Sequence, residues 1–162
     1  MAVSAYNTLD EFRAYWLEGQ RVFNTVNAMF QSESMKWRLQ KFKAKTPGLK
    51  FYYFNSKQYR RRIFMTEALF PISPLGLSNV FWEEGKDMPE WNPNVLKAGN
   101  LMDIGTKARA TYQISKGAGA ISSREFLNVN FKDKVANGTG FLVAYASIPS
   151  FPGYTPSKDY VT

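Results

Sequence analysis

Side chains that can form hydrogen bonds recur at every second position of residues 109–115 and, with the exception of Phe126, of residues 124–130. The period of two predicts strands, because successive side chains of a strand point to opposite faces of its sheet. One face of each strand is then apolar, and the other is mostly polar. Such a polar strip is either the solvent face of a sheet or a set of hydrogen-bonding groups inside an otherwise apolar cavity. Its members are Arg109, Thr111, Gln113 and Ser115 on the first strand and Arg124, Phe126, Asn128 and Asn130 on the second.

The chain contains no histidine and no cysteine. Disulfides, thiol catalysis, Cys/His zinc sites and histidine general bases are therefore excluded. No two carboxylates have the spacing of an acid–base site, and no P-loop or dinucleotide fingerprint occurs. The glycines at 117 and 119 lack the third glycine and the lysine of such a loop, so they predict a flexible turn. We expect a protein that is not an enzyme and holds no metal or cofactor.

The composition favours one domain over residues 1–162, with 13 Phe, 9 Tyr and 4 Trp that fill a core or line an apolar cavity. The net charge of +8 favours anionic membranes, nucleic acid or acidic proteins as partners and does not decide among them. We expect a transient contact with an anionic membrane surface and no nucleic acid partner. Arg60-Arg61-Arg62 is either a solvated strand edge or a contact for lipid headgroups. Neither a signal peptide nor a membrane-spanning run is present, so we expect a cytoplasmic protein or one held peripherally at membranes.

A helix is expected from a cap at Thr8 to about Gln31, because apolar residues recur there at helical spacing. Proline restricts its neighbours, so the Trp-Asn-Pro at residues 91–93 predicts a turn, with the Trp91 indole anchored in the core. Together these elements predict an α+β fold. The remaining expected elements are strands at 37–45, 49–55, 60–69, 96–104, 106–115, 124–131 and 140–148, a short helix from Pro74 to residues 83–85, and a loop over 149–162.

Three segments together resemble the START family, the steroidogenic acute regulatory protein-related lipid-transfer domains. They are Trp91-Asn92-Pro93-Asn94-Val95, Ser123-Arg124-Glu125-Phe126, and Gly140-Phe141-Leu142-Val143-Ala144-Tyr145-Ala146-Ser147. The resemblance covers residues 6–162 and is strongest to the sterol-binding branch. It implies a helix-grip fold, in which a curved antiparallel sheet wraps a long C-terminal helix around a lipid tunnel. Family domains extend beyond the point where this chain stops, so we expect the closing helix to be absent. A partner, a second copy or a membrane would then cover the cavity.

The resemblance also implies which residues meet the lipid. Met88 and Asn92 match positions at the tunnel. A buried acid–arginine pair of the sterol branch falls at Gln113 and Asn130 here, and neutral amides are easier to desolvate than charges. We expect both amides to point inward. The other expected lipid-binding residues are Thr111, Arg124, Phe126 and Asn128.

The expected function is non-enzymatic binding and transfer of a hydrophobic lipid, either a sterol or another isoprenoid such as a carotenoid. The bound lipid would take the place of a cofactor. Two alternatives stay open. The chain could store or carry a pigment without transferring it, or it could be an interaction subunit that has lost lipid binding.

Overall fold

The computed structural model describes residues 10–32, 35–41, 48–135 and 138–161. The chain divides into two compact units, one formed by Met1–Asn27 with Ser73–Thr162 and the other by Ala28–Ile72. The expectation of one domain over residues 1–162 stays a prediction.

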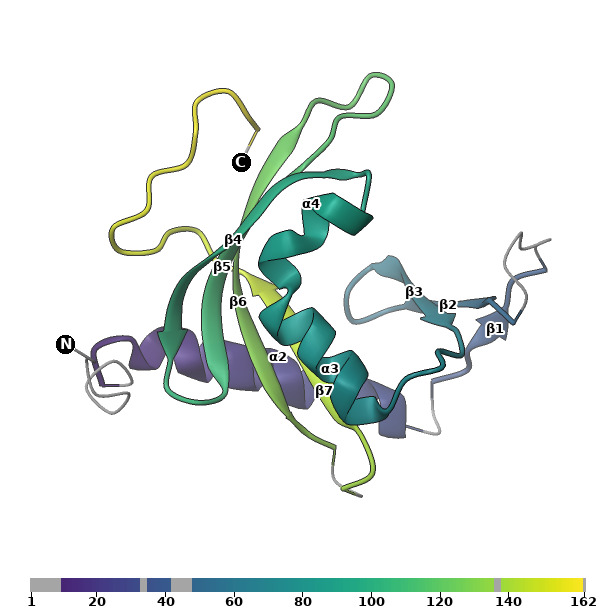
Figure 1. The fold of residues 1–162 in the computed structure, drawn as a ribbon. Helices are drawn as coiled ribbons and strands as arrows, with labels where there is room; N and C mark the ends of the chain where they lie inside the picture. Colours follow the sequence, from purple (N-terminus) through teal and green to yellow (C-terminus); the bar gives the residue numbers. More distant parts are fainter. Residues whose placement is uncertain (1–9, 33–34, 42–47, 136–137, 162) are drawn as a thin grey trace. The chain divides into compact units, whose positions relative to one another are not determined.

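The first unit is built on an antiparallel sheet with the strand order β4-β5-β6-β7 (Figure 1). The sheet is curved, and its strands confirm the four strands expected in this part of the sequence. β6 continues three residues beyond its expected end. The bounds are β4 (Val95–Ile104), β5 (Ala108–Ser115), β6 (Arg124–Lys134) and β7 (Phe141–Ser147).

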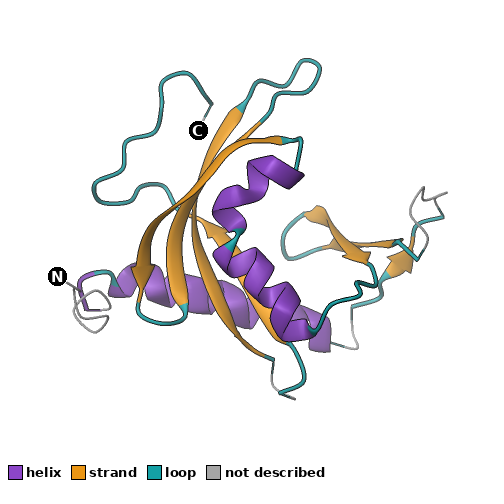
Figure 2. Ribbon diagram, viewed as in Figure 1, coloured by secondary structure: helices purple, strands orange, loops and turns teal. Residues whose placement is uncertain are grey.

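Helix α2 (Arg13–Gln31) packs on the apolar face of this sheet (Figure 2). Its expected end at Gln31 is confirmed, whereas the cap expected at Thr8 lies outside the described residues. Gly19 allows the close approach, because a Cβ there would lie 3.2 Å from the Cβ of Phe131 on β6. Phe23 adds its ring 5.5 Å from that of Phe131, so the N-terminal helix and the sheet share one core.

Three short helical segments follow residue 73: α3 (Pro74–Glu83), the 3₁₀ helix η1 (Gly85–Asp87) and α4 (Met88–Trp91). The expected start of α3 at Pro74 is confirmed. Ser73 caps it by accepting a hydrogen bond from the Gly76 amide at 3.1 Å, and proline at the first turn lacks only a donor that would have no helical partner. α3 buries Ser78 and Trp82, which are four residues apart and so share one helix face.

The C-terminal segment returns to the sheet as a loop. Phe151 stacks on Phe12 with ring centroids 5.3 Å apart, and Val161 forms a parallel bridge with Arg124. Within the described part of the chain, α4 is the last helix.

The second unit contains a three-stranded antiparallel sheet in the order β1-β2-β3. Its strands are β1 (Arg38–Leu39), β2 (Lys50–Ser56) and β3 (Arg61–Glu67). The expected strand over 37–45 is therefore confirmed only at residues 38 and 39 and is wrong at residues 37, 40 and 41. Its remainder from residue 42 lies outside the described residues. No helix among the described residues is long and apolar enough to span a membrane.

Candidate functional site

The register of β5 and β6 brings the polar strip together as the alternation predicts. Arg109 lies opposite Asn130, Thr111 opposite Asn128, Gln113 opposite Phe126, and Ser115 opposite Arg124. Directly opposite residues share a face of the sheet. Ala110 and Val129, which lie between them on the opposite face, are fully buried in the core shared with α2, and Tyr112 is partly buried there.

A cleft lies where α3, η1 and α4 cover the polar face of the sheet. Its volume is about 380 Å³ when the part open to solvent is included. The central part of the polar strip is therefore not an ordinary solvent-exposed face. Phe81, Trp82 and Met88 of the helical segments cover it. The lining residues are Phe81, Trp82, Gly85, Met88, Ala98, Gly99, Asn100, Thr111, Tyr112, Gln113, Asn128, Asn130 and Tyr145.

Three amides of the strip have different local partners. Asn130 is only 6% exposed, and its Oδ1 accepts a hydrogen bond from Thr111 Oγ1 at 3.3 Å. The Asn128 Oδ1 accepts one from Ser147 Oγ at 3.2 Å. Gln113 forms no side-chain hydrogen bond with another residue that the structure describes, so its amide can turn to a ligand or to water.

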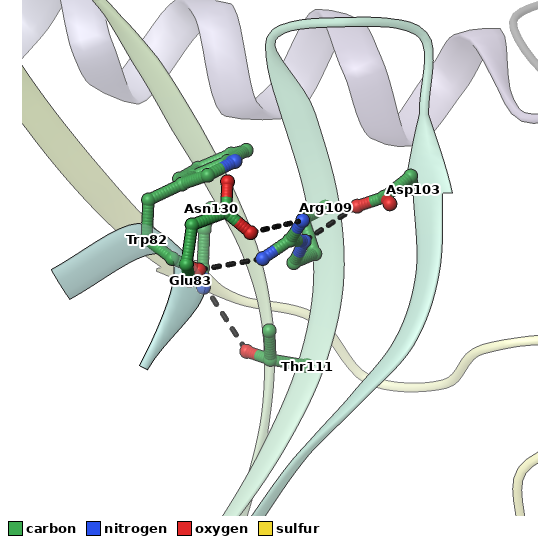
Figure 3. Close-up of polar contacts among 6 residues, drawn as sticks. All are labelled: Trp82, Glu83, Asp103, Arg109, Thr111 and Asn130. Carbon is green, nitrogen blue, oxygen red and sulfur yellow. Dashed lines mark hydrogen bonds and ion pairs between the residues drawn. The ribbon is translucent and has the colours of Figure 1, made fainter. Parts of the chain in front are cut away.

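Arg109 fixes the C-terminal end of α3 to the sheet (Figure 3). Its Nε donates to Asp103 Oδ1 at 2.5 Å, and its Nη1 donates to the Trp82 carbonyl oxygen, also at 2.5 Å. Its Nη2 lies 3.6 Å from a Glu83 carboxylate oxygen. A cation at the C-terminal end of a helix is stabilised by the unpaired carbonyls of the last turn.

Two cations contact the Trp82 ring. The Arg109 guanidinium carbon is 4.8 Å from the ring centroid, and the Lys132 ammonium is 5.0 Å from it. Cations over an indole face are attracted by its quadrupole, so these contacts add to the hydrogen bond that holds α3. The sequence placed Arg109 in the polar strip but did not indicate this role. The sequence feature that could have indicated it is Asp103, an opposite charge that lies six residues before Arg109, on the other side of the tight turn at Gly105.

The free space in the cleft is small. The space inside it measures about 30 Å³, which is room for roughly two water molecules. Sites for small organic ligands usually measure about 300–1,000 Å³. A lipid therefore needs a wider cleft than the one in this conformation.

Tyr145 borders the cleft from β7, opposite Asn130. Removal of water from around its hydroxyl raises the pKa of Tyr145 above the ordinary value. The phenol is therefore neutral at physiological pH and can both donate and accept a hydrogen bond.

Five of the eight residues expected to meet a lipid line this cleft, and three do not. Those that do are Met88, Thr111, Gln113, Asn128 and Asn130. Asn92 instead forms a local turn, because its Oδ1 accepts from the Asn94 amide at 3.1 Å. Arg124 and Phe126 lie at the start of β6, beyond the part covered by the helices, and Phe126 borders Pro149 and Pro156. The lipid contacts of all eight residues stay predictions.

The expectation that Trp91 anchors its turn in the core is wrong. The side chain is 49% exposed, at the end of a helix of one turn. The chain instead enters the core at Val95, the first residue of β4, which is buried. A turn with two prolines fixes the backbone but does not determine how deep the tryptophan lies.

Glu125 is a buried anchor that the sequence motif did not identify. It is 5% exposed and accepts hydrogen bonds from the Tyr154 hydroxyl and from the Ser157 amide at 2.8 Å. Burial of Tyr154, together with its hydrogen bond to Glu125, raises the pKa of the phenol. Tyr154 also stacks on Tyr112, with ring centroids 5.4 Å apart. Glu125 therefore holds the C-terminal segment on the α2 side of the sheet, away from the cleft.

The described residues contain no group of three or more acidic, histidine or cysteine side chains that could hold a metal ion. The residues that line the cleft carry no charge. The charged groups lie beside it at the end of α3, where Arg109 is paired with Glu83 and Asp103 and Lys132 lies over the Trp82 ring. The charged groups position α3 on the sheet, and the amides of the cleft can form hydrogen bonds with a ligand.

No protein-family model matches the chain, and no curated protein is similar to it. Solved structures do match. Human StAR-related lipid transfer protein 5 superposes with a TM-score of 0.71 at 13% identity, over 93% of this chain and 70% of that one. The STAR-related lipid transfer protein fragment 25–204 from Xanthomonas axonopodis gives 0.63 at 18% identity, over 76% and 66%. Human STARD10 gives 0.63 at 15% identity, over 85% and 54%.

Identities this low establish the fold and nothing finer. They confirm the resemblance found in the sequence at the level of architecture, although the chain spans only 54–70% of these three structures. The chain has the α+β helix-grip fold of START domains, with an antiparallel sheet between an N-terminal helix and short middle helices.

Proposed function

We propose that this chain binds one hydrophobic lipid between α3 and the polar face of the β4–β7 sheet, without enzymatic activity. The observation that carries the proposal is the composition of the cleft. Gln113 and Asn130 lie in it together with the apolar surfaces of Phe81, Trp82 and Met88. A few polar groups among apolar walls are typical of sites that bury an apolar molecule and orient its polar end. START-fold neighbours that are named as lipid-transfer proteins support the same function.

The mechanism follows from the two kinds of surface. Apolar walls remove the lipid skeleton from water, and about 300 Å² of buried apolar area contributes roughly 7 kcal/mol. Before the costs of association, that corresponds to micromolar binding. The Gln113 amide is free to bond a hydroxyl or ketone, while Asn130 is held by Thr111. Transfer between membranes would follow from release of the lipid at a membrane surface.

Entry of a lipid requires α3 to move away from the sheet, because the present free space is near 30 Å³. Arg109 holds the C-terminal end of α3, and the Ser73 cap begins the helix at the other end. We therefore assign the opening motion to α3 and η1, with the β4–β7 sheet as the fixed wall.

The lipid class within isoprenoids stays open between sterols and carotenoids, since either skeleton suits walls of rings and methionine. Storage of a pigment without transfer would use the same binding site and differ only in slower release of the bound carotenoid. A second candidate function is a protein-interaction module that has lost lipid binding, and the narrow cleft favours it.

Native mass spectrometry of the purified chain tests the proposal, after incubation with a sterol and, separately, with a carotenoid. We expect a one-to-one complex with at least one of them. Met88→Trp should abolish it by filling the cleft, whereas Leu96→Trp, on the exposed part of β4 and outside the cleft lining, should not. Binding of neither lipid by a folded chain would reject lipid carriage and leave the interaction module. Equal lipid binding by the Met88→Trp and Leu96→Trp variants would show that the lipid binds outside this cleft.

A further inference from the structure

The net positive charge of this protein comes from one of its two units. Ten of the 21 basic residues and two of the 13 acidic residues lie within Ala28–Ile72, which therefore carries a formal charge of +8. The other unit has eleven residues of each sign and is neutral. The net charge of the whole chain thus belongs to a segment of 45 residues, and the unit with the lipid cleft contributes none of it.

The cations of the second unit are available to a partner. The eight that lie in the described residues are all exposed, and the single described anion, Glu67, is paired with one of them at 2.7 Å. Lys50 is that partner. The exposed cations are Lys36, Arg38, Lys41, Lys50, Lys57, Arg60, Arg61 and Arg62.

The β1–β3 sheet presents cations and rings on the same face. Arg38, Tyr53 and Phe64 are directly opposite one another across the three strands, and so share a face. Arg62 joins them, with its guanidinium 4.7 Å from the centroid of the Tyr53 ring. Phe64 is 64% exposed although it lies in the middle of β3. This row, which we call the arginine–aromatic row, therefore combines positive charge with apolar area at one surface.

The segment after β3 adds aliphatic side chains. Leu69 is 93% exposed, and Phe70 and Ile72 are exposed as well. Soluble proteins seldom leave several large apolar residues of one short segment in water unless a partner covers them.

We propose that the Ala28–Ile72 unit is a docking surface for an anionic lipid bilayer, formed by the arginine–aromatic row and the Leu69–Ile72 segment. Lysine and arginine are attracted to anionic headgroups, and rings with aliphatic side chains insert into the boundary between headgroups and acyl chains. Charge complementarity alone would also admit a nucleic acid. Leu69 and Ile72 favour the bilayer, because an aliphatic side chain has an acyl chain to pack against there and no base edge to bond. The docking surface does not depend on lipid binding in the cleft.

Vesicle sedimentation tests this inference with two variants that lower the net charge equally, from +8 to +5. Arg38→Gln/Arg61→Gln/Arg62→Gln removes three exposed cations from the second unit. Lys86→Gln/Lys116→Gln/Lys134→Gln removes three from the first unit. Arg38 and Arg62 belong to the arginine–aromatic row, whereas Arg61 is next to Arg62 in β3 and points to the other face. Each cation near an anionic surface contributes a factor of about five, so loss of the two row arginines should weaken binding to phosphatidylserine vesicles at least about 25-fold. The lysine variant should bind nearly as well as the unchanged protein.

A third variant, Phe64→Ser/Leu69→Ser, tests the apolar contribution. Its loss of binding should persist at about 0.5 M salt, where electrostatic attraction is screened. Circular dichroism checks that each variant is folded, and unchanged protein on pure phosphatidylcholine vesicles gives a reference that needs no substitution. Equal losses in the two triple variants would overturn the proposal. So would binding of single-stranded RNA without binding of anionic vesicles. Lipid uptake into the cleft is measured separately, so failure of one proposal leaves the other standing.

Discussion

Replacing Arg109 by methionine tests whether this side chain is what holds α3 on the sheet. Methionine keeps the length of the side chain and removes its charge. The change removes the hydrogen bond to the Trp82 carbonyl, worth about 1.5–3 kcal/mol for a charged donor, and the contact with the Trp82 ring, worth about 1 kcal/mol. The contacts with Asp103 and Glu83 add less than about 1 kcal/mol, because both carboxylates are more than half exposed.

Part of this loss is recovered, because methionine has no charge to desolvate in a position that is 9% exposed in its side chain. We expect a net destabilisation of about 2 kcal/mol, which lowers Tm by about 8 °C. Asp103→Asn removes only the exposed ion pair and should cost less than about 1 kcal/mol. Urea unfolding of the two variants gives this order directly.

Hydrogen exchange distinguishes local release of α3 from a global loss of stability in Arg109→Met. Amides of α3, such as that of Glu84 bonded to the Val80 carbonyl at 3.1 Å, should exchange faster in Arg109→Met, while central amides of β5 change only with global stability. Lipid uptake should also become faster. A variant as stable as the unchanged protein, or one whose α3 amides change no more than those of β5, would refute the assignment of Arg109 as the contact that holds the helix.

Three other substitutions test the packing of the first unit by thermal and urea unfolding. Gly99→Ala would place a Cβ 2.4 Å from the Tyr112 ring and should cost about 1–3 kcal/mol, whereas Gly85→Ala, with open space around it, should be nearly neutral; equal effects would contradict the contact. Ser78→Ala should stabilise by about 1 kcal/mol, because the buried hydroxyl has no partner among the described residues; destabilisation would indicate a bond formed in solution. Tyr154→Phe should flatten the loss of stability above about pH 10, because a phenol whose pKa is raised on folding keeps its proton after the unfolded chain has lost it; an unchanged slope would argue against its bond to Glu125.

The strands of the first unit were predictable because two local signals agreed. A period of two marked β5 and β6, and glycines marked the turns between strands, including Gly105 and Gly138 with their positive φ angles. The strand at 37–45 failed in part because alternation also occurs in irregular chain. Among the described residues, only Arg38 and Leu39 pair in register with β2, and beyond them a single backbone hydrogen bond joins the Gln40 amide to the Phe51 carbonyl.

The sequence predicted the cleft only as one of two alternatives, a polar strip inside a cavity or a polar strip on the solvent face of a sheet. A strip of polar residues on one face looks the same in sequence whether water or a helix lies over it. The placement of α3 decides between them, and that placement depends on contacts between distant residues, such as Arg109 with the Trp82 carbonyl. The resemblance to START domains assigned the strip to the inside of a lipid tunnel, and Thr111, Gln113, Asn128 and Asn130 line the cleft. It did not indicate where along β6 the cover ends, which is why Arg124 and Phe126 lie outside the cleft.

The uneven distribution of charge between the two units is compatible with both proposals, lipid binding in the cleft and docking on a membrane. A cation beside a dry cleft is costly unless it is paired, and the buried Arg109 is balanced by two carboxylates that reach it from β4 and α3. Cations that attract a bilayer must instead be exposed and largely unpaired. The eight cations described in the second unit are all exposed, and Lys50 is the one of them that forms an ion pair with a described acid, Glu67. The two requirements conflict on one surface, because anions that neutralise a buried arginine also repel anionic lipids. Placing the neutral cleft and the cationic sheet in separate units removes the conflict.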